Sequence, residues 1–306
     1  MTINMRYVAG LDGGGSKTAL YCLDKEGNCL HKARFGTLNI NGAEVSVINQ
    51  TIKEIILFLS QFEIGLSGCA GITIATAGVS NPQAMGIIKN ALYLAGYQGE
   101  FMLQGDHEAA LRGAVGKFGV ILIAGTGSIC FGRSKDGTIA RSGGWGYLLD
   151  DEGSGYAIGR DMLKAVFRAE DGRNESTILT EVILKHFQAE NMGELLRFVY
   201  KTQTSKAQIS GLAPLLQAAV NEGDVQSSLI VQRAGLELLQ LVRAVLDKLQ
   251  LVKAPLALAG GVLENIPAIR EEIQRILNSK YPTLDIIKPR HSAAWGAADL
   301  ARESYL

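Results

Sequence analysis

Residues 7–24 read YVAGLDGGGSKTALYCLD, an apolar run that is interrupted by one aspartate and three glycines and then resumes. Because glycine has no Cβ, the backbone N–H groups of such a turn can approach an oxygen-rich ligand closely. A P-loop would need glycine at Ser16, before Lys17 and Thr18, and it would have to open a helix. Residues 19–24 are apolar instead and lead into the turn KEGN. The stretch therefore predicts a phosphate-binding β-hairpin rather than a P-loop.

The bulk composition favours a globular protein of the cytoplasm. The chain has 306 residues, 47% apolar and 20% charged, which suffices for one large or two ordinary domains. Lys+Arg and Asp+Glu both number 30, so no basic surplus points to nucleic acid or to an acidic membrane. No apolar signal core and no run of 18 apolar residues is present. We therefore expect a cytoplasmic protein whose partners include neither membrane nor nucleic acid.

Cysteine and histidine spacing argues against a metal or disulfide framework. Cys22, Cys29, Cys69 and Cys130 form no C-x-x-C pair and no Cys/His cluster, and each lies in or beside an apolar run. Buried free thiols are therefore expected, as in a reducing compartment. The four histidines, at positions 31, 107, 186 and 291, share no ligand spacing and are interpreted as structural.

The opening pattern recurs about 113 residues later. Residues 119–128 read GVILIAGTGS, and residues 129–140 continue as strand, turn and strand. A third strand-to-glycine turn occupies residues 255–262, PLALAGGV. Each turn alone is a weak signal, and chance likeness is the alternative, because glycine turns punctuate many α/β folds. Together they predict two related domains facing each other, with a nucleotide in the cleft between them.

The remaining apolar periodicity predicts mostly helices. Pro82 suits the first position of a helix. We expect Trp295 and the helix 209–220 to lie in the core. A hinge is expected near residues 115–118. Strands are expected at 71–78, 101–104 and 283–288, and helices at 44–62, 82–95, 108–115, 156–167, 176–187, 192–200, 209–220, 224–249 and 292–301.

Two aspartates are candidates for phosphoryl-transfer chemistry. Asp12, in the first turn, could hold Mg²⁺ beside a polyphosphate, partly through water; the alternative is an ordinary turn aspartate. Asp106 follows a short strand and precedes a helix, so it could be an N-cap. It could equally be a general base, since phosphoryl transfer to an alcohol needs a carboxylate within reach of the hydroxyl. The two roles of Asp106 can coexist.

Residues 142–155, SGGWGYLLDDEGSG, form the least generic segment. Its glycines expose backbone donors and acceptors, its acids can bind pairs of sugar hydroxyls, and Trp145 could stack on the apolar face of a ring. The alternative is a loop with an anchoring tryptophan and a solvated acid cluster. Asp151 and Glu152 could also start the next helix, where acids suit the helix dipole.

In their order and spacing, four motifs resemble the N-acetylglucosamine kinase family, which groups with the BadF/BadG-type ATPases in the sugar kinase, actin and heat-shock ATPase superfamily. They are DGGGSKT at 12–18, GD at 105–106, AGTGS at 124–128 and GGWG…DEGS at 143–154. The resemblance runs from about residue 6 to 301 and is closest between 100 and 160. The GGWG…DEGS segment is specific, whereas the glycine turns occur throughout the superfamily.

The resemblance implies an α/β fold of two ribonuclease-H-like (actin-like ATPase) domains facing an interdomain cleft. Residues 1–116 would form the sugar-side domain with the first phosphate hairpin. Residues 117–306 would form the nucleotide-side domain, with the last helix able to pack back on the N-terminal domain. It also implies ATP and Mg²⁺ as cofactors, and the family is often dimeric, so a homodimer is expected.

The resemblance also implies roles for individual residues. Asp12 would lie near Mg²⁺, and Asp106 would deprotonate the sugar 6-hydroxyl. The sugar would contact Asn39, Asp106, Gly144, Trp145 and Asp151. The nucleotide phosphates would lie against Gly13, Gly14, Gly15, Ser16, Lys17, Gly125, Thr126, Gly127 and Ser128. The adenosine would lie near Ser210, Gly260 and Asn265, which are the weakest transfers.

The function implied is an ATP-dependent kinase for the 6-hydroxyl of an amino sugar, foremost N-acetylglucosamine, with N-acetylmuramic acid and glucosamine left open. An ATP-driven regulator or activator of the BadF type is the main alternative, and a sugar sensor without chemistry is a third. The chain departs from the usual family pattern at Gly105 and His107, on either side of Asp106. It also lacks the cysteine patterns of the zinc-containing sugar kinases and of the iron–sulfur dehydratase activators.

Overall fold

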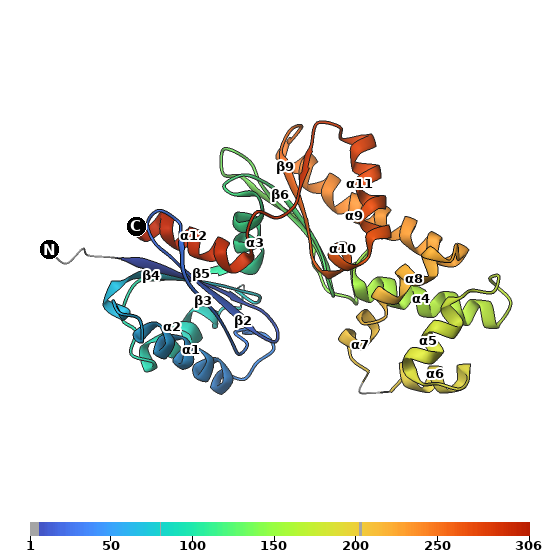
Figure 1. The fold of residues 1–306 in the computed structure, drawn as a ribbon, viewed down its shortest axis with the longest axis horizontal. Helices are drawn as coiled ribbons and strands as arrows, with labels where there is room; N and C mark the ends of the chain where they lie inside the picture. The colour runs from blue at the N-terminus through green and yellow to red at the C-terminus, as the bar shows by residue number, and fades with distance from the viewer. Residues whose placement is uncertain (1–5, 80, 202–203) are drawn as a thin grey trace. The chain divides into compact units, whose positions relative to one another are not determined.

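The computed structural model describes residues 6–79, 81–201 and 204–306 (Figure 1). The chain forms two compact units. Unit 1 contains the residues up to Lys117 together with Pro289–Leu306, and unit 2 contains Phe118–Lys288. The last helix of the chain, α12 (Ala293–Tyr305), therefore belongs to unit 1.

Unit 1 is built on a five-stranded sheet with the order β3-β2-β1-β4-β5. Its strands are β1 (Tyr7–Gly13), β2 (Thr18–Leu23), β3 (Cys29–Phe35), β4 (Cys69–Thr76) and β5 (Phe101–Gly105). The first three strands form an antiparallel meander, while β4 and β5 run parallel to β1. Strand β2 begins at Thr18, directly after the glycine turn, and Asp12 pairs with Ala19. The predicted hairpin is confirmed, and no helix opens at Lys17.

Helices cover both faces of this sheet (Figure 1). Helices α1 (Val45–Ser60) and α2 (Ala84–Leu94) lie on one face, and α3 (Asp106–Val115) and α12 on the other. A short 3₁₀ turn, η1 (Leu66–Gly68), leads into β4. Helix α2 begins two residues after the predicted Pro82, and α3 begins two residues before the predicted Glu108.

Unit 2 repeats the same strand order in a second sheet, β10-β9-β6-β7-β8. Its strands are β6 (Gly119–Ala124), β7 (Ser128–Arg133), β8 (Ile139–Gly143), β9 (Pro255–Ala259) and β10 (Asp285–Ile287). Strands β6, β7 and β8 are antiparallel, and β9 and β10 run parallel to β6. The hairpins β1–β2 and β6–β7 thus occupy corresponding places in two similar sheets. This repeat confirms the predicted α/β fold with two ribonuclease-H-like domains.

In the described residues, unit 2 has more helices than unit 1, and it contains the longest one. The 25-residue α9 spans Val225–Leu249, and its apolar side buries Leu238, Val242 and Val245. The others are α4 (Gly155–Glu170), α5 (Leu179–Phe187), α6 (Met192–Val199), α7 (Lys206–Ser210), η2 (Ala213–Leu215), α8 (Leu216–Asn221), α10 (Gly261–Asn265) and α11 (Pro267–Lys280).

Three local predictions are wrong. The helix expected over 209–220 is broken into α7, η2 and α8 around Gly211 and Pro214, since proline lacks the N–H that a continuing helix needs. Trp295 is only partly buried and stacks on His291 with ring centroids 3.8 Å apart. Of the four cysteines expected to be buried, Cys29 is exposed; the other three are buried, and burial raises the pKa of the Cys22 thiol.

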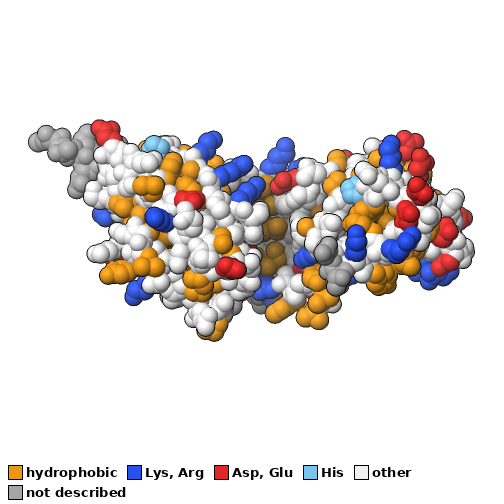
Figure 2. Space-filling view, turned by 90° about the horizontal axis from the view of Figure 1, so that it is seen from below, with side chains coloured by type: hydrophobic (Ala, Val, Ile, Leu, Met, Phe, Trp, Pro, Cys, Tyr) orange, Lys and Arg blue, Asp and Glu red, His pale blue; other side chains and the backbone are white. Residues whose placement is uncertain are grey.

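The surface agrees with the balanced composition. On the face shown in Figure 2, Lys and Arg side chains are scattered among acidic, apolar and neutral ones. Within the described residues, no helix is both long and apolar enough to cross a membrane.

Helix α12 packs so closely on β1 and on α3 that each of the two contacts requires a glycine. A Cβ on Gly10 of β1 would lie 1.9 Å from the backbone nitrogen of Ala298. A Cβ on Gly296 of α12 would lie 2.0 Å from the carbonyl oxygen of Ala109 in α3. The buried Arg112 of α3 also bonds Asp299 of α12 at 2.5 Å. Burial alone would raise the pKa of Asp299, but hydrogen bonds from Arg302 and Arg112 hold that pKa below its usual value.

We predict that Gly296→Ala destabilises the protein, because the added methyl group meets backbone atoms that cannot rotate away. The expected loss in the free energy of unfolding is about 1–3 kcal/mol. The matched control is Gly86→Ala in α2, where a Cβ meets nothing within 4 Å. That control should be neutral or stabilising by up to about 1 kcal/mol. Urea unfolding followed by circular dichroism measures both, and equal stability of the two variants would contradict the packing argument.

Candidate active site

Two acidic residues come together at one edge of the unit 1 sheet. Gly13 at the end of β1 pairs with Thr76 at the end of β4, and Thr76 pairs with Gly105 at the end of β5. The carboxyl ends of the three parallel strands therefore lie side by side, and they bring Asp12 and Asp106 to the same edge. The pKa of Asp12 is raised to about 6, first by burial and then by the negative charge of Asp106.

Asp106 is the first residue of α3, and Gly105 is the N-cap. The prediction that Asp106 caps the helix is wrong, because no side chain caps this end. Instead, its Oδ1 accepts a hydrogen bond from the His107 backbone N–H at 2.8 Å, and the imidazole Nδ1 lies at 3.4 Å. The bond to His107 lowers the pKa of Asp106, while burial opposes the shift. Its carboxylate is 52% exposed and ionised at neutral pH, as a general base must be.

The first glycine turn is held by hydroxyl groups from neighbouring elements. The Gly14 N–H donates to the Lys17 carbonyl at 3.0 Å, and the Thr37 hydroxyl donates to the Gly14 carbonyl at 2.8 Å. The Thr76 hydroxyl donates to the Leu38 carbonyl at 2.8 Å. These bonds fix the loop after β3 against the turn.

Asn39 lies in that loop, beside the glycine turn. Its N–H donates to the Thr37 hydroxyl at 3.0 Å, and its Oδ1 accepts from the Asn41 N–H at 3.2 Å. A Cβ on Gly15 would lie 3.9 Å from Asn39 Nδ2. Unit 1 thus gathers Asn39, the turn with Ser16 and Lys17, Asp12 and Asp106 around the ends of β1 and β5.

The second glycine turn lies between β6 and β7. The residues of unit 2 that are expected to bind the nucleotide lie around it. The Gly155 N–H, at the start of α4, donates to the Gly125 carbonyl at 2.7 Å. A Cβ on Gly155 would lie 2.5 Å from Ser210 Oγ, and one on Gly260 would lie 2.4 Å from the Ala124 carbonyl oxygen. Gly260 also has a φ of +97°, which favours glycine. Ser210, Gly260 and Gly125–Ser128 therefore lie close together.

The second glycine turn lies at the start of a helix, which suits an anion. The 16-residue helix α4 begins at Gly155, so its N-terminal end, which carries partial positive charge, meets the turn. Asn265, the last residue of α10, is oriented by a bond from its Nδ2 to the Gly261 carbonyl at 2.9 Å. Ser154, rather than Asp151 or Glu152, caps α4, so the suggestion that those acids start the helix is wrong.

Asp151 is buried against the second turn, with 3% of its surface exposed and a φ of +65°. Its Oδ1 lies 3.4 Å from the Ser128 N–H, and its Oδ2 accepts from Lys206 Nζ at 2.8 Å. A Cβ on Gly127 would lie 2.8 Å from the same Oδ2. The picture of a solvated acid cluster is therefore wrong. Sequence reasoning missed Lys206, and its only local signal is the Ser205–Gln208 capping box that opens α7.

Trp145 is presented to solvent rather than used as an anchor. It is 69% exposed, and the Arg141 guanidinium lies 4.7 Å from its ring centroid. Arg141 also donates to the carbonyls of Gly143 at 3.0 Å and Gly144 at 2.7 Å, which holds the glycine segment in place. The alternative of an anchoring tryptophan is wrong, and the free ring face is suited to stacking on a sugar. Arg141 is a second residue that sequence reasoning missed.

The acidic side chains of Asp12 and Asp106 are the residues to consider as ligands of a divalent cation. In the part of the chain that the structure describes, no three His, Cys, Asp or Glu side chains form a metal-binding group. Asp12 and Asp106 nevertheless place two acids close together, and the charge of Asp106 adds to the effect of burial in raising the pKa of Asp12. A cation there would be held by one or two carboxylates plus phosphate oxygens and water, which is the usual setting for Mg²⁺.

Comparisons with known proteins agree with this arrangement. The model of the BadF/BadG/BcrA/BcrD ATPase family matches residues 9–301. An N-acetylmuramic acid/N-acetylglucosamine kinase of Clostridium acetobutylicum is 37% identical over 97% of this chain and 99% of its own. An N-acetyl-D-glucosamine kinase of Dictyostelium discoideum is 32% identical over 96% and 97% of the two chains. The crystal structure of a candidate N-acetylglucosamine kinase from Chromobacterium violaceum has a TM-score of 0.78 at 26% identity and covers 97% of this chain and 99% of its own.

We predict a pH-dependent gain in stability for Asp12→Asn. The pKa of Asp12 is about 6 in the folded protein against 3.8 ordinarily. The ionised carboxylate therefore destabilises the folded state above pH 6. This penalty disappears below pH 4, where the carboxyl group is protonated. In metal-free buffer the variant should exceed the wild type by about 2 kcal/mol at pH 7.5, with the gap shrinking towards pH 4.

Urea unfolding at pH 7.5 and 5.0 measures this gap. The control is Asp24→Asn, since Asp24 accepts a bond from the Asn28 N–H at 2.8 Å and its pKa is lowered. It should give no gain at pH 7.5. A gap for Asp12→Asn that did not change between the two pH values would contradict the raised pKa.

Proposed function

Because the chain belongs to the BadF/BadG/BcrA/BcrD ATPase family, we propose that it is an ATP-dependent kinase that phosphorylates the 6-hydroxyl of an amino sugar, with N-acetylglucosamine as the foremost substrate. The observation that carries the proposal is the ionised Asp106 carboxylate beside Asp12 at the edge of the unit 1 sheet. The kinases at 32% and 37% identity support the same class of reaction.

In this proposal Asp106 is the general base. Its Oδ1 is oriented by the His107 N–H, and the half-exposed carboxylate can accept the proton of a sugar hydroxyl. Transfer of the γ-phosphoryl group depends mainly on positioning and charge, and a placed base typically contributes 10²–10⁴-fold. Mg²⁺, when bound near Asp12, would neutralise phosphate charge.

The two glycine turns would bind the phosphates through their backbone N–H groups. Gly13–Lys17 supplies one set and Gly125–Ser128 the other, with the start of α4 adding positive potential. Ser210, Gly260 and Asn265 would line the adenosine site, which is supported by the close approach of Gly260 to Ala124 and of Gly155 to Ser210.

Asn39, Gly144, Trp145 and Asp151 would bind the sugar, together with Asp106. Trp145 offers its exposed ring, and Gly144 offers backbone groups held by Arg141. Asp151 already has a partner in Lys206, so binding a sugar hydroxyl requires it to share or release that ion pair. A sugar-side domain of residues 1–116, a nucleotide-side domain of 117–306, a homodimer and a cytoplasmic location stay predictions.

The second candidate function is an ATP-driven activator of the BadF type, which the matched family includes by name. The two functions differ in their need for a sugar.

We predict ADP release in a coupled assay only when N-acetylglucosamine, N-acetylmuramic acid or glucosamine is added with ATP and Mg²⁺. Glucose lacks the amino group and is the control. ADP release at one rate, indifferent to every sugar, would favour the activator.

We predict that Asp106→Asn lowers kcat by about 10²–10⁴-fold, because an amide cannot accept the hydroxyl proton. Sugar binding, measured by isothermal titration calorimetry, should persist. Asp136→Asn is the matched control, since Asp136 lies in an exposed turn where Thr138 N–H donates to it at 3.0 Å. Turnover of Asp106→Asn at the wild-type rate would remove Asp106 from the mechanism.

A further inference from the structure

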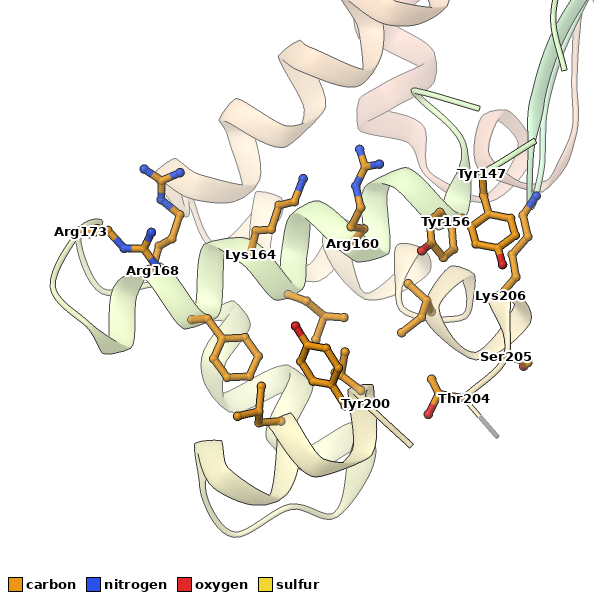
Figure 3. Close-up of a pocket in the computed structure, with 15 residues that line it drawn as sticks. Tyr147, Tyr156, Arg160, Lys164, Arg168, Arg173, Tyr200, Thr204, Ser205 and Lys206 are labelled. Carbon is orange, nitrogen blue, oxygen red and sulfur yellow. The ribbon is translucent and has the colours of Figure 1, made fainter. Parts of the chain in front are cut away.

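Unit 2 contains a cavity of about 620 Å³ between α4, α6 and α7 (Figure 3). Four of the five cations in its wall pair with acids, so the wall holds little charge that would attract an anion. These pairs are Arg160–Glu152, Lys164–Asp161, Arg173–Asp171 and Lys206–Asp151. A side chain with more to explain lies in unit 1, next to Asp106, and it is the imidazole of His107.

The imidazole of His107 occupies the space that a side chain at position 105 would need. A Cβ on Gly105 would lie 2.4 Å from His107 Cε1 and 2.9 Å from its Nδ1. The backbone conformation does not require glycine here, because Gly105 has a φ of −66° and a ψ of 143°, which any residue adopts. The absence of a Cβ at Gly105 therefore makes room for the imidazole.

Two groups of His107 converge on one oxygen of Asp106. The backbone N–H donates to Oδ1 at 2.8 Å, and the imidazole Nδ1 lies 3.4 Å from the same oxygen. An ionised carboxylate only accepts hydrogen bonds, so the imidazole in this position has to carry a hydrogen on Nδ1. The Asp106 side chain is 52% exposed, and a single bond to Oδ1 would let its carboxylate turn. The imidazole limits that rotation.

Helix α3 carries both side chains on a backbone that is held elsewhere. The Arg112–Asp299 pair, at 2.5 Å, ties α3 to α12. A Cβ on Gly113 would lie 2.3 Å from the carbonyl oxygen of Ser292, the N-cap of α12. The His107 side chain is 28% exposed and belongs to the opposite end of α3. Replacing the imidazole therefore leaves this packing in place, and its effect falls on the Asp106 carboxylate.

We propose that Gly105 and His107 form a positioning pair for the general base. The glycine admits the imidazole, and the imidazole holds Oδ1 of Asp106 so that Oδ2 accepts the proton of the sugar hydroxyl. The inference rests on the proposed kinase function and extends it by two residues. Neither residue touches a reacting atom, and His107 acts through Asp106. A base that is misplaced by about 1 Å can cost about 10²-fold in rate, so its orientation matters.

The first test compares two amides at position 107. His107→Asn places an amide N–H near the site of Nδ1, whereas His107→Gln places it near the site of Nε2. For N-acetylglucosamine, kcat should stay within about threefold of the wild type in His107→Asn and fall by about tenfold in His107→Gln, because only the second loses the hydrogen bond to a charged group. KM for ATP should change little in either variant. Equal kcat values in the two variants would overturn the proposal.

The control for the amide comparison is another histidine of unit 1. His31 stacks on Phe62 with ring centroids 3.8 Å apart. His31→Asn and His31→Gln should both leave kcat at the wild-type value, because this imidazole has no part in the proposed site.

The second test is a double-mutant cycle at positions 105 and 107. Gly105→Ala pushes the imidazole away from the carboxylate, so it should lower kcat by about tenfold, as His107→Ala does. In the His107→Ala background the added methyl group meets no imidazole, and the double variant should keep the kcat of His107→Ala. Additive losses would overturn the pair. Gly86→Ala, where a Cβ meets nothing within 4 Å, is the matched control.

A third measurement does not depend on turnover. Long-range ¹H–¹⁵N NMR should show a hydrogen on Nδ1 of His107 at pH 7.5, and the signal is identified by its loss in His107→Asn. A bare Nδ1 would overturn the pair. This measurement uses the wild type, so it decides the matter if a variant at position 105 or 107 does not fold.

Failure of the inference and failure of the proposed function give different results. A wild type that turns over N-acetylglucosamine no faster than His107→Gln would overturn the positioning pair alone. A wild type that turns over no amino sugar would reject the kinase function, and the positioning role with it.

Discussion

Two carboxylates that repel each other lie at one edge of one sheet, and the rest of unit 1 is arranged to keep them there. The register Gly13–Thr76–Gly105 fixes the ends of β1, β4 and β5 in line, so neither Asp12 nor Asp106 can move away without breaking strand pairing. Burial and, second, the negative charge of Asp106 raise the pKa of Asp12. A fold under no functional constraint gains nothing from such a pair, and perturbed acids of this kind are typical of functional sites.

The two glycine turns are held in place by different groups. In unit 1, hydroxyl groups of Thr37 and Thr76 hold the turn and the following loop. In unit 2, the start of α4 and the carboxylate of Asp151 hold it. The strand order therefore repeats together with a glycine turn at the same place in each hairpin, while the groups that support the turn differ.

The sequence predicts local features well and long-range pairings poorly. Apolar runs on either side of glycines specify both hairpins, because strand and turn preferences depend on neighbours in the chain. The helix expected over 209–220 fails because Pro214 overrides an apolar periodicity. The Lys206–Asp151 pair joins residues 55 positions apart, and no local sequence pattern predicts it. Exposure is equally hard to predict: Trp145 is a large aromatic residue and Cys29 lies beside an apolar run, yet both are exposed in the fold.

Asp151 forms a buried ion pair whose role is not limited to stabilising the fold. Its left-handed backbone and almost complete burial are costs that an ordinary loop avoids. Replacing a buried pair by apolar side chains is often neutral or stabilising, so stability alone does not explain it. The same carboxylate contacts the Ser128 N–H of the second glycine turn and the Lys206 ammonium. Asp151 therefore ties this turn to α7 within unit 2, and a change at either contact alters the charge balance at the other.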